Sequence, residues 1–475
     1  MTSISLTPEE MRRLGYRVID EIVAHWAEVE SKPVMRLASR AALEAKLREP
    51  LPEEPTPVDS LLEQLQRDVW SNIGNVIHPR FFAFIPSPSN FVSVLADALV
   101  SAYNPFAGNW LEGSGPAQIE LVTIDWLRQA IGLPESAGGL FVSGGSMANL
   151  TALAAAIHHR VPRQLDRAVV YFSDQTHSSI DRALRVLGVP DSQMRKLSSD
   201  DRYRLPLETL RETVAADRAR GELPFCVIAN AGTTNTGAVD PLAALGEFCR
   251  AEGLWLHVDG AYGAAAAFSP RGKEMLRGLE QVDSLSLDPH KWLFQPFEIG
   301  CVLLRDAGLL RQTYAYTAEY LKDTERDLLE EINYYDYGIQ LTRGFRALKL
   351  WLSLKAFGAR AFRQAIEQGF EMAELAERIV RESPYLELIT PAEMGILTFR
   401  AIRVGMAEDD LNELNRQLVQ TMVAEGFAFA NSTTLKGKVA IRLCTINPRT
   451  TGADLRDTLH WIEQLGQDGR KGTSS

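Results

Sequence analysis

Residues 225–262 read FCVIANAGTTNTGAVDPLAALGEFCRAEGLWLHVDGAY, and this stretch indicates the fold class. It opens with the apolar run FCVIAN, continues through a polar loop into a helical pattern that starts at Pro241, and closes with a second apolar run, LWLHVDGAY. Two strands joined by a helix form the unit from which parallel sheets are built, and strands buried on both faces are apolar throughout. The stretch therefore predicts a mostly parallel sheet.

The same alternation continues on both sides of this stretch. Further apolar runs begin near residues 139, 168, 283 and 300, with helical patterns between them, which predicts an α/β domain over residues 86–350. Ligands of such sheets bind at the carboxyl ends of the strands. A long helical stretch after residue 350 leads to three more apolar runs, so we expect a smaller α+β domain over residues 351–475.

The first 85 residues predict a helical arm. Thr7, Pro8 and Glu10 have the spacing of a capping box with proline in the first turn, and a second helix is expected near Asp59. Such an arm can embrace a second subunit or pack on its own domain, and the sequence leaves both possibilities open.

Composition and charge exclude several classes of function. The 475 residues are 45% hydrophobic, carry a net charge of −11 and contain no basic block, which argues against nucleic acid and membrane surfaces as partners. The start of the chain lacks the pattern of a secretory signal, so a cytoplasmic protein is expected. Four cysteines at unrelated positions predict neither a disulfide framework nor a metal site.

Four segments at predicted strand ends carry unusual side chains. VSGGSMAN places glycines and Ser146 before a helix, which suits an anion cradle or an ordinary tight turn, and no GK[ST] follows as in a Walker loop. His177 could cap a helix or stack on a flat ligand. The hydroxyl-rich AGTTNTGAVDPL is either a binding loop or a plain loop. Asp259 ends an apolar strand, where a carboxylate requires an ion pair or a protonated ligand nitrogen.

The segment SLSLDPHKWLF, residues 284–294, adds a lysine inside an apolar run. An ammonium group there needs a partner, because lysine is almost never buried alone. One ligand accounts for Lys291 and for the four loops together. Pyridoxal 5′-phosphate has a phosphate, an aromatic face, a ring nitrogen that must stay protonated and an aldehyde that a lysine captures as a Schiff base.

The order GGSMAN, SDQTHSS, GTTNTGAVD, HVDGAY, DPHKW resembles the pyridoxal-phosphate-dependent aromatic L-amino-acid decarboxylases, in the fold class shared with aspartate aminotransferase. HPRFFAFIPS and LTRGFRALKLW extend the resemblance over most of the chain. It implies a fold type I enzyme with a seven-stranded, mostly parallel sheet in its large domain. It also implies decarboxylation of an L-amino acid, most simply an aromatic one, and a homodimer with shared active sites.

The resemblance also implies roles for individual residues. Lys291 would bind the cofactor aldehyde, Asp259 the ring nitrogen, and Tyr320 would donate a proton to the product carbon. His177 and Ala261 would lie against the two ring faces. Around the phosphate and the ring substituents we expect Gly145, Ser146, Thr234, Asp288 and His290.

The sequence departs from these relatives mainly around the substrate. Asp288 stands where animal members often have asparagine, and a carboxylate beside a phosphate requires a donor of its own. The substrate-binding positions are expected to include Phe84, Ile85, Phe106 and Thr342, a set that matches no single relative. The pattern therefore leaves the preferred amino acid open.

Three alternative functions fit parts of this pattern. A transaminase would need an arginine for the substrate carboxylate, and the sequence does not single one out. An aromatic acetaldehyde synthase typically replaces the loop tyrosine or the stacking histidine, whereas Tyr320 and His177 are both present. A pyridoxal-sensing transcription factor would need a DNA-binding module and a basic face, which the first eighty residues lack.

Overall fold

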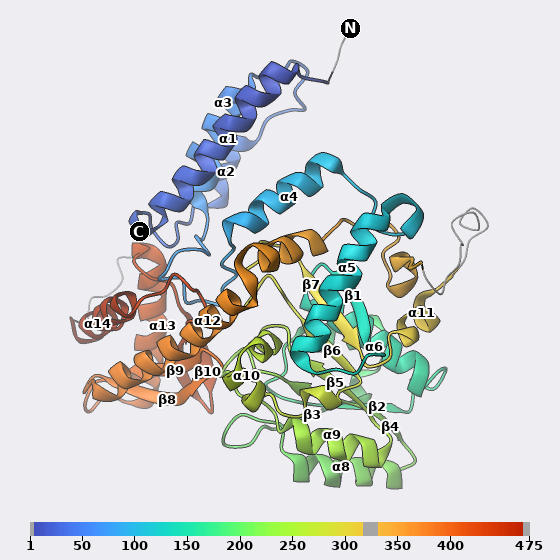
Figure 1. The fold of residues 1–475 in the computed structure, drawn as a ribbon. Helices are drawn as coiled ribbons and strands as arrows, with labels where there is room; N and C mark the ends of the chain where they lie inside the picture. The colour runs from blue at the N-terminus through green and yellow to red at the C-terminus, as the bar shows by residue number, and fades with distance from the viewer. Residues whose placement is uncertain (1–3, 317–330, 469–475) are drawn as a thin grey trace.

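The structure is a computed structural model and describes residues 4–316 and 331–468 (Figure 1). Its larger sheet has seven strands in the order β1-β7-β6-β5-β4-β2-β3. Strand β7 runs antiparallel to both of its neighbours, and the other pairs are parallel. The predicted fold class is confirmed. The strands are β1 (Gly138–Val142), β2 (Ala168–Ser173), β3 (Met194–Leu197), β4 (Leu223–Asn230), β5 (Trp255–Asp259), β6 (Ser284–Leu287) and β7 (Gly300–Leu304).

The stretch that indicated the fold forms β4, helix α9 (Leu242–Glu252) and β5. β4 and β5 are parallel and in register, with Asn230 opposite Asp259, so both polar residues stand at the same edge of the sheet. In Figure 1, α9 and α8 lie together on one side of the sheet. The other helices of this region are α6 (Gly145–Arg160), α7 (Ser179–Val186), α8 (Leu207–Ala219), α10 (Pro270–Met275) and α11 (Gly308–Tyr314).

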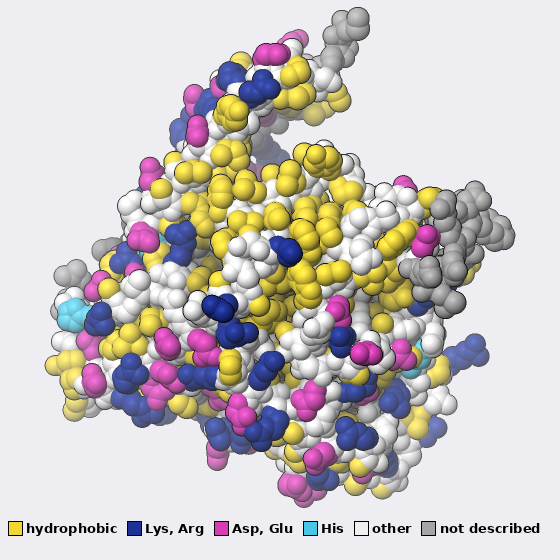
Figure 2. Space-filling view, in the orientation of Figure 1, with side chains coloured by type: hydrophobic (Ala, Val, Ile, Leu, Met, Phe, Trp, Pro, Cys, Tyr) yellow, Lys and Arg dark blue, Asp and Glu magenta, His cyan; other side chains and the backbone are white. Residues whose placement is uncertain are grey.

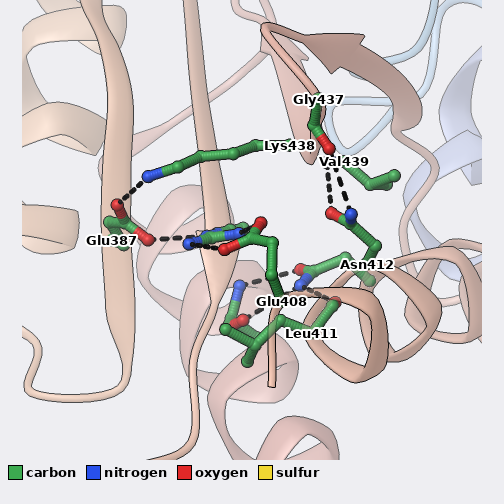
Figure 3. A network of polar contacts seen from close by, with 10 residues as sticks. Glu387, Glu408, Leu411, Asn412, Gly437, Lys438 and Val439 are labelled. Carbon is green, nitrogen blue, oxygen red and sulfur yellow. Dashed lines mark hydrogen bonds and ion pairs between the residues drawn. The ribbon is translucent and has the colours of Figure 1, made fainter. Parts of the chain in front are cut away.

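The smaller sheet is antiparallel, with four strands in the order β10-β11-β9-β8. Its strands are β8 (Leu386–Glu393), β9 (Ile396–Ala401), β10 (Asn431–Leu435) and β11 (Lys438–Cys444), and its helices are α12 (Ala347–Glu382), α13 (Glu408–Glu425) and α14 (Gly452–Asp468). A polar network joins these elements (Figure 3): Arg400 on β9 binds Glu387 on β8 and Glu408 at the start of α13. Lys438 also binds Glu387, at 2.9 Å. The network ties α13 to the sheet.

The N-terminal helices are α1 (Pro8–Glu28), α2 (Arg40–Leu47) and α3 (Val58–Gln64). The predicted capping box is present, because Thr7 accepts a hydrogen bond from the Glu10 amide and donates its own amide to the Glu10 side chain. No residue of α1 is buried, and the three helices project from the body of the molecule (Figure 1). They are followed by α4 (Phe91–Tyr103) and α5 (Trp110–Ile131).

The segment between α3 and α4 packs into the small sheet. Phe82 is fully buried in the core of that sheet, and its N–H donates to the carbonyl of Phe429 at 2.7 Å. This contact brings residues 80–85 to the edge of the large sheet, where the strand ends meet. No helix in the described ranges is both long and apolar enough to cross a membrane.

Candidate active site

A cavity of about 500 Å³ lies at the carboxyl ends of the large-sheet strands. Eleven of the predicted site residues line it, namely Phe84, Ile85, Gly145, Ser146, His177, Thr234, Asp259, Ala261, Asp288, His290 and Lys291. Phe106 and Thr342 do not line it. Tyr320 lies outside the described residues. The structure therefore gathers segments that are up to 207 positions apart in the sequence into one wall.

Lys291 pairs with Asp288. The Nζ atom lies 2.9 Å from Oδ2 of Asp288, whose side chain is 2% exposed, while the lysine side chain is 24% exposed and faces the cavity. The other carboxylate oxygen, Oδ1, is buried and has no hydrogen-bond partner in the described part of the chain. Asp288 is thus the partner that the lysine in an apolar run required.

His290 stands next to this pair. Its Nδ1 atom donates to the carbonyl of Ile299 at 2.7 Å, which leaves Nε2 as the bare nitrogen of the neutral ring. Burial is the largest cause of a lowered pKa of His290, and the Asp288 carboxylate opposes it. The imidazole is therefore held neutral beside the cavity at neutral pH.

Asp259 is a buried carboxylate that has no cationic partner among the described residues. It accepts three hydrogen bonds, from the side chain of Asn149 at 3.0 Å, the amide of Ala261 at 3.1 Å and the hydroxyl of Ser286 at 3.2 Å. Three donors satisfy much of its hydrogen-bonding capacity and hold it rigidly at the cavity wall. A protonated ligand nitrogen is the missing charge that this arrangement suits.

The start of α6 forms a narrow cradle. A Cβ atom on Gly145 would come within 2.9 Å of both the Ala261 methyl and Oδ2 of Asp288, so only glycine lets the three segments approach this closely. No side chain caps the helix, and its first turn contains no acidic residue. The free amides and the helix dipole favour an anion at this position.

His177 follows β2, and Ser179 fixes the orientation of its ring. Its Nδ1 atom accepts from the hydroxyl of Ser179 at 2.8 Å and from the amide of Ser179 at 3.2 Å. Two donors on Nδ1 place the ring proton on Nε2 and fix the ring orientation. A flat ring is thus presented to the cavity.

The cradle, the ring, the unpaired carboxylate and the amine fit pyridoxal phosphate, and similarity to known proteins agrees. The model of the pyridoxal-dependent decarboxylase conserved domain matches residues 41–402. The chain belongs to the pyridoxal-dependent decarboxylase family. This decarboxylase uses pyridoxal phosphate and acts on an amino acid.

Several relatives match nearly the whole decarboxylase. It is 48% identical over 467 residues to an aromatic-L-amino-acid decarboxylase of Bacillus atrophaeus, covering 98% of this chain and 97% of the relative. A phenylacetaldehyde synthase of Arabidopsis thaliana is 31% identical, with 96% of each chain covered. The structure of Oryza sativa TDC with PLP and tryptamine superposes with a TM-score of 0.93 at 28% identity, over 98% of this chain and 99% of that one.

Sequence reasoning predicted Phe84 but missed Asn431 and Arg442, the two residues that hold its backbone. Phe84 has a backbone φ of 52°, a left-handed conformation that is rare for a bulky side chain. Two strands of the small sheet hold it there: Asn431 on β10 accepts from its N–H, and Arg442 on β11 donates to its carbonyl. The Phe84 ring meets Phe429 edge to face at 5.7 Å.

Arg442 is 3% exposed and also donates to the carbonyl of Thr234, another cavity residue. Burial lowers the pKa of this guanidinium, and its Nη2 atom has no partner in the described part of the chain. Arg442 therefore joins the two cavity-lining segments that contain Phe84 and Thr234 through hydrogen bonds to their backbone carbonyls. A signal for it was present, since VAIRLCTI places an arginine inside an otherwise apolar strand.

Proposed function

We propose that this enzyme removes the carboxylate of an aromatic L-amino acid and releases the corresponding amine and carbon dioxide. The observation that carries the proposal is the meeting of the Lys291 amine, the unpaired Asp259 carboxylate and the Gly145 cradle in one cavity whose remaining wall is partly apolar. Phe84, Ile85 and Phe297 supply apolar area for a substrate ring. Relatives named for aromatic amino acids support this choice.

The charges of the cavity argue against an acidic substrate. Among the described residues that line it, Lys291 is the one lysine or arginine, and it is already paired with Asp288. A second substrate carboxylate would meet Asp288 and Glu298 without a cation to bind it. The lining therefore favours a substrate side chain without charge.

Pyridoxal phosphate supplies an electron sink for the bond that breaks. In the proposal, Lys291 holds the cofactor aldehyde and Asp259 keeps the ring nitrogen protonated. Gly145 and Ser146 bind the phosphate through the start of α6, while His177 and Ala261 enclose the ring. Thr234 and His290 complete the wall. Tyr320 is assigned the proton donor on sequence grounds.

A substrate panel tests the proposal. Carbon dioxide and amine release would be measured from tryptophan, 5-hydroxytryptophan, tyrosine, dihydroxyphenylalanine, phenylalanine, histidine and glutamate. We expect an aromatic amino acid to give the highest kcat/KM, and Lys291→Ala to abolish turnover while pyridoxal phosphate still binds. A preference for glutamate would overturn the substrate class. Aldehyde and peroxide as the main products would make the enzyme an acetaldehyde synthase instead.

We further propose a homodimer in which each chain completes the site of the other. Figure 2 shows hydrophobic side chains gathered over α4 and the start of α5, below the projecting arm. Leu99 and Tyr103 of α4 are 48% and 81% exposed, and Tyr16 of the arm helix α1 is 66% exposed. A face of this kind on a chain of ordinary composition favours burial against a second copy.

Phe106 and Thr342 support the shared site. Both lie outside the cavity, yet their segments touch, because a Cβ atom on Gly108 would meet the Phe106 ring and the carbonyl of Leu341. Thr342 is exposed. Phe106 lies in the segment that joins α4 to α5, so the proposal assigns both residues to the cavity of the second copy.

Complementation between variants tests this assembly. Lys291→Ala and Phe106→Asp would each be inactive alone, whereas co-expressed mixed dimers would contain one site with an intact Lys291 and an intact Phe106. We expect mixed dimers, isolated with two affinity tags, to regain activity. Inactive mixed dimers would refute the shared site, and an active monomer by light scattering would refute the dimer.

We also place the enzyme in a reducing compartment, the cytoplasm. Its four cysteines are free and buried, as expected where thiols stay reduced. Subcellular fractionation with an antibody to the native protein tests this proposal.

A further inference from the structure

A chain of buried hydrogen bonds runs beneath the active site and ends at its two ring-binding residues. The indole N–H of Trp255 donates to Oγ of Ser284 at 2.8 Å, and Ser284 lies 2.9 Å from Nδ1 of His257. Nε2 of His257 lies 3.0 Å from Oδ1 of Asn149. Asn149, His257 and Ser284 are all 0% exposed, so bulk solvent does not reach these contacts.

Asn149 is the branch point of this chain. Its Nδ2 group donates to Oδ2 of Asp259 at 3.0 Å and to Oγ of Ser179 at 3.0 Å. Ser179 in turn contacts Nδ1 of His177 at 2.8 Å. One amide group therefore reaches the carboxylate proposed for the ring nitrogen and, through one hydroxyl, the ring proposed to stack on the cofactor.

The direction of every bond follows from the chemistry of Asp259. An ionised carboxylate only accepts, so the NH₂ side of the Asn149 amide must face it and the oxygen must face His257. His257 then carries its proton on Nε2 and accepts from Ser284 on Nδ1. The Ser179 hydroxyl, which accepts from Asn149, gives its own hydrogen to His177. The chain of hydrogen bonds therefore has one consistent arrangement of donors and acceptors.

We propose that Asn149 is a positioning residue that fixes the Asp259 carboxylate and the His177 ring relative to each other, and that His257 fixes the Asn149 amide from behind. The inference deepens the proposed function, since it rests on the cofactor roles assigned to Asp259 and His177. Without the Asn149 amide, Asp259 keeps its hydrogen bonds from Ala261 and Ser286. His177 keeps its contact with Ser179, but the Ser179 hydroxyl loses the group that orients it.

Cofactor binding to the apo protein measures this effect independently of turnover. We expect Asn149→Leu, which keeps the branching of the side chain at Cγ, to raise the dissociation constant of pyridoxal phosphate about 10- to 100-fold, the effect of losing a hydrogen bond to a buried charge. The circular dichroism of the bound cofactor should also change, because the ring is no longer held in one orientation. Asn149→Ala should give the same two changes.

His257 provides the rescue. His257→Gln can still donate to Asn149 from its amide, whereas His257→Leu cannot, so the glutamine variant should retain near wild-type cofactor dichroism and the leucine variant should not. Asn415→Ala is the matched control. Asn415 is also a fully buried asparagine, bonded to Ala401 and Leu411 in the small domain, and its loss should lower stability without altering cofactor binding.

The outcomes separate this inference from the proposed function. Wild-type protein that fails to bind pyridoxal phosphate would overturn both. Wild-type binding together with unchanged affinity and dichroism in Asn149→Leu would overturn the role of Asn149 alone. Equal spectra for His257→Gln and His257→Leu would overturn the role of His257.

Discussion

The Nζ atom of Lys291 lies 2.9 Å from Oδ2 of Asp288, and the same carboxylate oxygen lies against the Gly145 cradle. The amine proposed to hold the cofactor and the position proposed for its phosphate therefore share one buried acid. An anionic ligand at the start of α6 approaches this acid as a like charge, while Lys291 and the helix dipole attract the ligand. The net effect of these charges on the affinity for an anionic ligand can be measured.

Asp288→Asn should tighten non-covalent cofactor binding about tenfold, because it removes a negative charge beside the expected phosphate position and keeps the shape of the side chain. The measurement is the dissociation constant of pyridoxal phosphate in the Lys291→Ala background, where no covalent bond contributes. Weaker binding in the double variant would show that the carboxylate itself is needed, for example to hold the backbone of the cradle.

Arg442→Lys should raise KM about tenfold with a smaller change in kcat. An ammonium cannot donate at once to the carbonyls of Phe84 and Thr234, so the strained Phe84 loop should relax away from the substrate. Steady-state kinetics on the preferred substrate measure the split. Arg400→Lys on the neighbouring strand β9 is the control, because Arg400 binds Glu387 and Glu408 (Figure 3) and does not line the cavity. A change in kcat alone would contradict the positioning role.

Tyr320→Phe should divert the reaction from amine to aldehyde, ammonia and peroxide under air. Without the phenol, the carbon that loses carbon dioxide has no proton donor and is exposed to oxygen. Product ratios under air and under argon measure this. Unchanged amine formation would show that Tyr320 is not the donor.

Acid should destabilise the protein partly through His257. Burial lowers the pKa of this fully buried histidine to about 4, against 6.5 for the ordinary side chain, although the Asp259 charge opposes the shift. As the pH falls below 6.5, His257 becomes protonated in the unfolded chain, whereas in the folded chain it stays neutral until the pH reaches about 4. Stability is therefore lost over that window.

The contribution of His257 to this loss of stability is on the order of 3 kcal/mol. Urea unfolding of the apo protein at several pH values should show a shallower loss for His257→Gln than for the wild type. The remaining loss should reflect His78, whose pKa burial also lowers to about 4. Identical pH slopes for the two proteins would contradict this assignment.

Most strands of the large sheet could be predicted because each is an unbroken apolar run. β3 was missed for the same reason: Met194–Leu197 is only partly buried at the edge of the sheet and has no such pattern. β10 was missed as well, since its residues alternate between exposed and half-buried before Leu435. Edge strands receive little of the burial that makes central strands recognisable.

Some residues of the site could likewise be predicted from the sequence, and others could not. Lys291, Asp259 and His177 were recognised because each is a polar side chain at the end of an apolar run. Asn149 stood inside a quoted motif without a role, because its partners His257 and Asp259 come more than 100 positions later in the chain. Contacts of that range depend on how the helix α6 packs against the strands.

The sequence by itself determined the parallel sheet and the cofactor class, and it singled out the amine and the carboxylate proposed to hold the cofactor, because these follow from hydrophobic period and from charges placed where charge is costly. Only the tertiary structure decided which groups pair with them: Asp288 with Lys291, Asn149 with Asp259, and Arg442 with the Phe84 backbone. The physical reason is that a run of residues encodes its own burial, whereas a hydrogen bond depends on positions within a few tenths of an ångström that only the packed chain sets.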